Sequence, residues 1–131
     1  MESRIINLES EQDISIARYE VRLIAGALGF RSIDQTRLAT ITSELARNIV
    51  KYAERGSLTA QQATGGVREG LRLVFEDSGP GIPDINAAMR DGFTTGGGLG
   101  KGLPGSKRLA DEFDIESEVG HGTRVTVIRW L

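Results

Sequence analysis

The chain has 131 residues, of which 39% are hydrophobic and 26% charged, the balance of an ordinary folded domain. This length suits one domain and hardly two, so we expect a single domain over residues 1–131. The net charge of −2 without a basic stripe argues against a nucleic-acid reader; the lack of cysteine excludes disulfides and thiol catalysis, and the single histidine excludes His-cluster metal sites.

The first part of the chain predicts a strand and a helix. Residues Arg4–Leu8 are typical of a short strand at a sheet edge. Ser10 and Asp13 form a capping-box start for the helix, and Gly29 ends it as a C-cap. Six apolar residues recur between them at helical spacing: Ile14, Ala17, Val21, Ile24, Ala25 and Leu28.

A second helix follows directly. It is expected to begin at a second capping box, Ser32–Gln35, and to end near Gly56. Its apolar stripe consists of Leu38, Ile41, Leu45, Ile49 and Tyr52. The polar residues 57–70, which include three glycines, predict either a strand hairpin or a loop.

The remainder predicts strands around short helices. Leu71–Asp77 alternates as a strand, and Asp84 is placed to cap a short helix that ends at Met89-Arg90. Residues 92–103 predict irregular structure, after which Pro104 suits the first turn of a helix that runs to about Ala110. Strands are expected at 113–119 and 123–130. The order predicts an α/β (α+β) two-layer sandwich, a mixed sheet covered on one face by helices.

The chain shows no signal for a membrane. No apolar run approaches the roughly 18 residues that a membrane span needs. The N-terminus lacks the basic start and apolar core of a signal peptide. We therefore expect a cytoplasmic protein that acts without a membrane or a nucleic acid as partner.

Two polar residues flank the stripe of the second helix. Glu44 and Asn48 lie about one turn apart, so that a carboxylate and a carboxamide sit together at the edge of the core. Arg47 is expected to point outward. The alternative is that Glu44 and Asn48 are ordinary boundary residues of an amphipathic helix.

Asp77 ends a strand whose inward side chains are apolar. Side chains alternate along a strand, so Asp77 shares the buried face of Leu71, Leu73 and Phe75. A buried carboxylate needs a partner or changes its protonation. The turn Ser78–Pro83 that follows contains two glycines, so a ligand can approach closely. The alternative is an Asp that only caps its own turn.

Glycine is concentrated in one segment. Seven of the 17 glycines fall between Gly92 and Gly105, and Lys101 lies among them. Backbone N–H groups without Cβ atoms can wrap phosphate oxygens, and the same glycines allow a lid to open and close. The alternative is a flexible loop without a ligand.

Familiar nucleotide motifs do not explain this segment. Residues 100–105 match G-x-G-x-x-G, but no strand leads into them and no acidic residue follows at the dinucleotide-binding spacing. A Walker A loop is excluded because Gly102 follows Lys101. The chain is too short for a two-lobed protein kinase.

The last strand begins with Gly120-His121-Gly122-Thr123. If this strand lies beside Leu71–Asp77, the Thr123 hydroxyl joins the Asp77 carboxylate at the end of the sheet. His121 is expected to face solvent in the turn rather than to accept a phosphoryl group.

Taken in order, these segments resemble the GHKL superfamily of ATP-binding domains, which share the Bergerat fold. Glu44–Asn48 is similar to its N box and Asp77–Gly81 to its first glycine box. Gly98–Gly102 is similar to the second glycine box in the ATP lid, and Gly120–Thr123 to the late Gly-x-Gly-Thr element. Four matches in register are far more specific than any one.

The whole chain further resembles the RsbT-type switch kinases of the bacterial stressosome, through Glu76–Ile85, Asp91–Gly97 and Leu103–Leu109. The resemblance implies an ATP-dependent serine/threonine kinase that acts on STAS-domain proteins (RsbS-like and RsbR-like). It also implies that the released protein activates an RsbU-like phosphatase. The alternatives are an anti-sigma factor of the same superfamily and an ATP-binding scaffold without activity.

The resemblance also implies roles for individual residues. Asp77 would accept from the adenine amino group with Thr123 nearby, Asn48 would hold Mg²⁺ against the phosphates, and Glu44 would polarise the substrate hydroxyl or a water. The remaining nucleotide-binding positions that it implies are Gly79, Gly81, Gly98, Gly100, Lys101 and Gly102.

Overall fold

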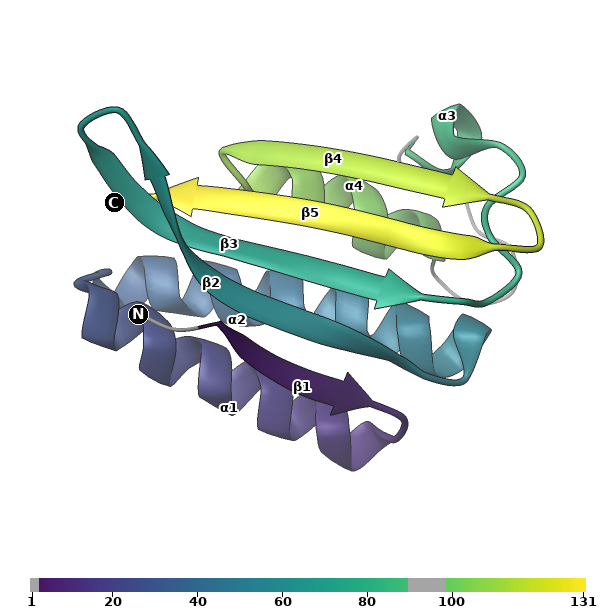
Figure 1. Cartoon of the computed structure of the whole chain (residues 1–131), viewed down its shortest axis with the longest axis horizontal. Coiled ribbons are helices and arrows are strands. Elements are labelled where there is room, and N and C mark those ends of the chain that lie inside the picture. The colour runs from purple at the N-terminus through teal and green to yellow at the C-terminus, as the bar shows by residue number, and fades with distance from the viewer. Residues whose placement is uncertain (1–2, 90–98) are drawn as a thin grey trace.

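The computed structural model describes residues 3–89 and 99–131, with the backbone alone for 99–102. The strands are β1 (Arg4–Leu8), β2 (Gly56–Gly65), β3 (Arg68–Asp77), β4 (Glu112–Glu118) and β5 (Gly122–Trp130). The helices are α1 (Glu11–Leu28), α2 (Ser32–Asn48), the π-helical turn η1 (Ile49–Ala53), α3 (Ile85–Ala88) and α4 (Leu99–Leu109). Figure 1 shows their arrangement in space.

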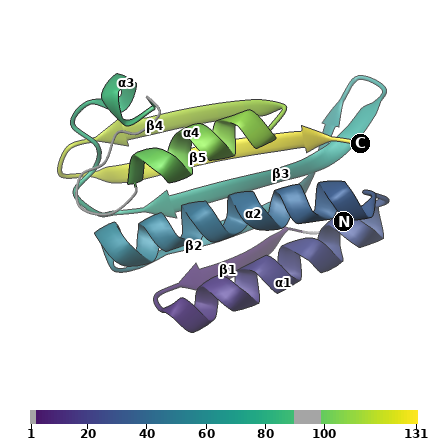
Figure 2. The ribbon, with the colours of Figure 1, turned by 180° about the vertical axis from the view of Figure 1, so that it is seen from behind.

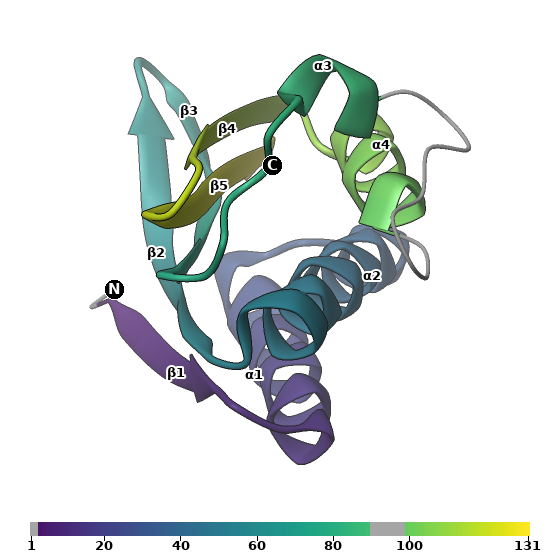
Figure 3. The same cartoon turned by 90° about the vertical axis from the view of Figure 1, so that its right-hand side faces the viewer.

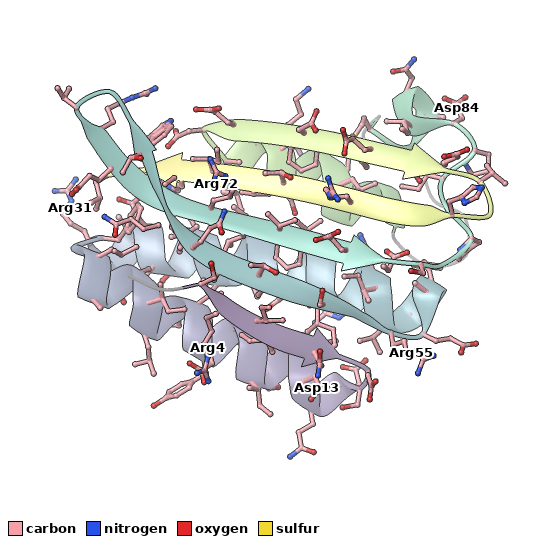
Figure 4. The ribbon with its side chains drawn as sticks, viewed as in Figure 1. Arg4, Asp13, Arg31, Arg55, Arg72 and Asp84 are labelled. Atoms are coloured by element: carbon pink, nitrogen blue, oxygen red, sulfur yellow. The ribbon has the colours of Figure 1, made fainter. Side chains whose placement is uncertain are left out.

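The molecule has two layers, as predicted. The five described strands form one sheet, and α1, α2 and α4 cover a single face of it (Figures 2 and 3). The buried face of α1 is the predicted one, with Ile14, Ala17, Val21 and Ala25 turned inward. The other face of the sheet is open and carries polar side chains such as Arg72 (Figure 4).

The sheet is antiparallel throughout its described strands, whereas the sequence predicted a mixed sheet. The strand order is β1-β2-β3-β5-β4, and each neighbouring pair is antiparallel. The connection through α3 and α4 does bring β4 back in the direction of β3. However, β5 inserts between these two strands, so no parallel pair forms. The polar stretch 57–70 belongs to a strand hairpin. Of the two structures predicted for it, a hairpin or a loop, the hairpin is therefore correct.

The helix ends differ in how well local sequence predicts them. The Ser10 hydroxyl accepts from the Asp13 N–H of α1 at 3.4 Å, and the Asp13 carboxylate accepts from the Glu9 N–H at 2.9 Å. Gly29 caps the C-terminus with φ of 104°. The second capping box is wrong: Ser32 is already helical, and the N-cap is Arg31, which makes no side-chain cap.

Helix α4 begins earlier than predicted. Its first residue is Leu99, so Pro104 lies inside the helix rather than in its first turn. A proline has no N–H to donate to the carbonyl four residues before it, so the helical ladder lacks one bond at Gly100. By their backbone, residues 99–102 form a helical turn, whereas the sequence predicted irregular structure there.

The guanidinium of Arg129 connects the sheet to the start of α2 and to the end of α4. Arg129 on β5 donates to the Leu109 carbonyl at the end of α4 (2.6 Å) and to the Asp34 carboxylate in the first turn of α2 (2.8 Å). Arg37 also donates to Asp34, at 3.0 Å. The cation at a helix C-terminus and the anion at a helix N-terminus both complement the helix dipoles. The hydrogen bond from Arg129 holds the pKa of the Asp34 carboxyl below its usual range.

None of the helices in the described part of the chain is long and apolar enough to cross a membrane.

We predict that Asp34→Asn lowers the free energy of unfolding by about 1–2 kcal/mol at pH 7, because hydrogen bonds to a charged group are lost. The pKa of Asp34 is lower in the folded than in the unfolded state, so the contribution is complete above pH 3.8. It is lost as the pH falls below that value through the folded-state pKa. Urea denaturation of both proteins between pH 2.5 and 7 measures the difference.

The matched control is Asp114→Asn, which changes an exposed carboxylate on β4. It should leave the free energy of unfolding within about 0.5 kcal/mol of the wild type. A stability difference between Asp34→Asn and the wild type that does not shrink in acid would contradict the ion-pair explanation.

Candidate functional site

A cavity of about 470 Å³ opens at the end of the sheet where β3 stops. Its walls come from the end of α2 and from η1, from the ends of β3 and β5, and from α3 and the loop before it; Figure 3 looks onto this end of the molecule. Most of the lining is apolar and includes Leu45, Phe75, Ile82, Leu103 and Val125. The polar lining residues are Asn48, Tyr52, Asp77, Asp84 and Thr123. An apolar cavity with a few polar groups is the usual form of a small-molecule site.

Asp77 lies in this wall, as its position in the strand predicted. Leu71, Leu73 and Phe75 are buried along the same face of β3, and Asp77 follows them into the cavity. Its Oδ1 accepts from the Gly79 N–H at 2.8 Å. Burial raises the pKa of the Asp77 carboxyl above its usual range, and the N–H groups of Gly79 and Thr123 offset this only in part.

The loop after Asp77 packs so closely that two of its residues must be glycine. A Cβ atom on Gly79 would lie 2.5 Å from the Cβ of Ala53 in η1. Gly81 has φ of +79°, and a Cβ there would lie 2.4 Å from the Glu118 carbonyl oxygen. Gly81 lines the cavity directly, whereas Gly79 acts through its bond to Asp77. The absence of Cβ atoms thus allows the loop to pack between η1 and the end of β4.

The end of α2 brings Asn48 to the cavity but not Glu44. The Asn48 Nδ2 atom is buried and has no hydrogen-bond partner among the described residues, so the fold does not use this amide donor. Glu44 lies outside the lining, and its Oε1 is 3.5 Å from Nη1 of the exposed Arg47. The outward position expected for Arg47 is confirmed. Glu44 and Asn48 therefore share a helix edge but not the cavity wall.

The π-helical turn η1 adds residues that the sequence pattern did not indicate as ligand contacts. Ile49, Tyr52 and Ala53 all line the cavity. The pattern placed Tyr52 on a regular helical stripe, because a single π turn leaves no signature in the spacing of apolar residues. Such turns are frequent at functional sites.

Thr123 lies opposite Asp77 in the register of β3 and β5, as expected from the sequence, and lines the cavity. Its hydroxyl is 2.8 Å from the Ser117 hydroxyl on β4. Sequence reasoning missed Ser117. A signal was available, because Ser117 continues the inward-facing series of Phe113 and Ile115 and is the polar member of that series.

The glycine-rich segment is described only in part. Gly98 lies outside the described residues, as does most of the predicted lid. Gly100, Lys101 and Gly102 form the first turn of α4 by their backbone. Leu103, the next residue, lines the cavity, so this turn of helix starts beside it. His121 is 72% exposed, as expected for a turn residue.

The family model for histidine kinase-, DNA gyrase B- and HSP90-like ATPases matches residues 33–130. The chain belongs to this family. The match includes all the cavity residues named above. The two-layer Bergerat fold that the sequence predicted is confirmed, and the nucleotide of the family is ATP.

Two individual proteins are similar to this chain in sequence. The chain is 49% identical over 126 residues to the serine/threonine-protein kinase RsbT of Bacillus subtilis, covering 96% of this chain and 95% of the relative. It is 30% identical over 116 residues to the anti-sigma F factor of Geobacillus stearothermophilus, covering 85% and 80%. The RsbT-type resemblance seen in the sequence is therefore confirmed, with the anti-sigma factors as more distant relatives.

Solved structures agree on the fold. The mycobacterial sensor histidine kinase MprB superposes with a TM-score of 0.59 at 15% identity, covering 98% of this chain and 97% of that chain. The catalytic domain of the histidine kinase ThkA gives 0.58 at 18% identity, covering 99% and 98%. Identities this low carry the fold alone.

We predict that Asp77→Asn raises Tm by about 1–3 °C at pH 7. The asparagine keeps an acceptor for Gly79 but removes a charge that burial disfavours. Since the pKa of Asp77 is raised on folding, the wild type loses stability as the pH rises from 3.8 through the folded-state pKa, and the variant does not. The gap in Tm should close below pH 3.8. Thermal denaturation by circular dichroism measures it, with Asp114→Asn as control; a variant less stable than the wild type at pH 7 would refute this view of Asp77.

Proposed function

We propose that this protein is an ATP-dependent serine/threonine protein kinase whose nucleotide site is the cavity at the end of β3. One observation carries the site assignment: the half-buried carboxylate of Asp77 and the unused amide of Asn48 line one apolar cavity from opposite elements. The proposal of kinase activity is supported by the 49% identity to the kinase RsbT.

The apolar part of the cavity suits a purine ring, and Asp77 supplies its polar recognition. An ionised carboxylate is a hydrogen-bond acceptor only. Asp77 therefore favours a base edge that presents a donor, such as the amino group of adenine. The N–H groups of Gly79 and Thr123 favour the charged form of this carboxylate, and they offset in part the rise in its pKa that burial causes.

Asn48 lines the cavity from the end of α2, and we assign it to a magnesium ion that holds the phosphates. Its carboxamide oxygen is a hard ligand of the kind that Mg²⁺ takes together with phosphate oxygens and water. When bound, Mg²⁺ neutralises triphosphate charge that would otherwise oppose attack on the γ-phosphate. We assign the backbone of Gly98, Gly100 and Gly102, and the Lys101 ammonium, to the phosphates.

Glu44 is proposed to polarise the hydroxyl of the substrate serine or threonine. It lies one helical turn before Asn48 and outside the cavity lining, and its side chain is 41% exposed, so a protein substrate can reach it. Its ion pair with Arg47 is solvent-exposed, and such pairs contribute little. The carboxylate is thus available to an incoming hydroxyl as a general base.

We propose STAS-domain proteins of the RsbS-like and RsbR-like kinds as substrates and an RsbU-like phosphatase as a second partner, with the cytoplasm as the site of action and one domain over residues 1–131. The relationship to the anti-sigma F factors supports a second candidate, in which ATP organises a surface that sequesters a sigma factor. Labelled ATP incubated with purified STAS proteins tests the transfer of the γ-phosphate. A pull-down distinguishes the two candidates, because capture of a sigma factor rather than a phosphatase or a STAS protein would favour the second.

We predict that Asp77→Asn weakens ATP binding about 10- to 100-fold, because the amide presents an N–H group where the adenine amino group needs an acceptor. Isothermal titration calorimetry with Mg²⁺-ATP measures the affinity. Asp114→Asn, which alters a distant carboxylate, should bind as the wild type does. Unchanged affinity in a folded Asp77→Asn protein would refute the site.

Glu44→Gln is expected to lower the rate of phosphoryl transfer about 10²- to 10⁴-fold while the affinity for ATP stays within twofold. The reason is that Glu44 lies outside the cavity lining and acts on the hydroxyl rather than on the nucleotide. Single-turnover transfer to a STAS protein gives the rate. Glu69→Gln, an exposed carboxylate at the far end of β3, is the control. An equal loss of ATP affinity would place Glu44 in nucleotide binding instead.

A further inference from the structure

A hydroxyl on β4 connects two parts of the cavity wall, the loop before α3 and the start of β5. The Ser117 Oγ accepts from the Ile82 N–H at 2.7 Å, donates to the Gly122 carbonyl at 3.2 Å and lies 2.8 Å from Thr123 Oγ1. Ile82 and Thr123 both line the cavity, whereas Ser117 does not. Ser117 is therefore placed to act on a ligand through its neighbours.

The three contacts fix the direction of the Thr123 proton. A serine hydroxyl has one proton and two acceptor lone pairs. The Ile82 N–H occupies one lone pair, and the contact to the Gly122 carbonyl, itself only an acceptor, requires the Ser117 proton. All three contacts are then satisfied together only if Thr123 donates its proton to the remaining lone pair of Ser117.

This arrangement decides what Thr123 offers to the cavity. With its proton committed to Ser117, Thr123 presents only lone pairs of Oγ1 to a ligand. Asp77, its partner in the strand register, is likewise an acceptor. The polar end of the cavity thus carries two acceptors side by side, which match an exocyclic amino group with its two N–H donors and oppose a carbonyl oxygen.

We propose that Ser117 is a positioning residue that locks Thr123 as an acceptor, and thereby makes the site select a 6-aminopurine over a 6-oxopurine nucleotide. The inference rests on the proposed ATP site and extends it to the residue that sets base specificity. Without Ser117 the Thr123 hydroxyl can rotate and donate to a 6-oxo group, so discrimination falls even though every lining residue remains.

The same hydroxyl also has a structural role that the test must separate. The Gly120 N–H donates to the Pro80 carbonyl at 2.9 Å, and the bond from Ile82 to Ser117 is a further link between the 78–83 loop and the β4–β5 hairpin. Loss of this link would weaken binding of any purine nucleotide equally. A change in the ratio of two affinities is therefore the informative quantity.

The experiment measures the dissociation constants of ATP and inosine triphosphate by calorimetry with Mg²⁺, because inosine carries an oxo group where adenosine has its amino group. Ser117→Ala is expected to reduce the ratio of the inosine triphosphate constant to the ATP constant about fivefold relative to the wild type. Ser117→Thr, which restores a hydroxyl, should keep the wild-type ratio within twofold. Ser57→Ala, a serine on the open face of β2, is the matched control and should also keep it.

Thr123→Val provides an independent arm, since it removes the acceptor itself. It should lower the ratio as Ser117→Ala does, and the double variant should lower it no further. If Ser117→Ala does not fold, Thr123→Val and Ser117→Thr still decide: an unchanged ratio in Thr123→Val, or a collapsed ratio in a folded Ser117→Thr, overturns the proposal.

Two further outcomes separate a failure of the Ser117 proposal from a failure of the proposed ATP site. Equal weakening of both nucleotides in Ser117→Ala leaves the ratio unchanged and shows a structural link only, which overturns the positioning role while the ATP site stands. A wild type that binds neither nucleotide overturns the proposed function, and the specificity proposal with it.

Discussion

The site depends on keeping a carboxylate at the buried end of an apolar strand. Asp77 continues the inward series of β3, so the same alternation that builds the core also turns a charge toward the cavity. Two backbone N–H groups, from Gly79 and Thr123, stabilise its charged form. Both depend on tertiary structure: the first on a tight glycine turn, the second on β5 lying beside β3 in register. Displacing either would leave the half-buried charge with one stabilising N–H group instead of two.

Local features were predictable from the sequence, and features set by distant contacts were not. The caps at Ser10, Gly29 and Asp84 involve neighbours within five residues, and each was predicted correctly. The mixed sheet was wrong because the insertion of β5 between β3 and β4 is a choice of strand order, which alternation does not encode. The Ser32 capping box was wrong for a different reason: the helix begins one residue earlier, with Arg31 as the N-cap, and the Gln35 side chain donates to the Phe30 carbonyl instead of closing a box with Ser32.

The candidate site follows the same division. Asp77, Asn48 and Thr123 were predicted because strand and helix periodicities place each at the edge of the core, and the cavity brings them together. The position of Glu44 outside the lining depends on where the cavity ends, which helical spacing alone does not define. Tyr52 enters the cavity lining through a π turn, and Ser117 contacts Thr123 from outside the lining, so neither residue is indicated by a motif. The family match covers these residues but assigns none of them a role.

The Arg129 network and the proposed nucleotide site lie at opposite ends of α2. At the cavity end, Asp77 is held at a raised pKa and the Asn48 amide is buried without a partner among the described residues. Both features cost free energy that a bound ligand can recover. At the other end, Arg129 joins α2, α4 and β5 through a charged network whose carboxylate has a lowered pKa and so favours folding. Since α2 carries Asp34 in its first turn and ends at Asn48, one helix connects the stabilising network to the cavity wall. The fold can therefore tolerate the unfavourable burial of Asp77 and of the Asn48 amide, while the elements that form the cavity wall stay aligned.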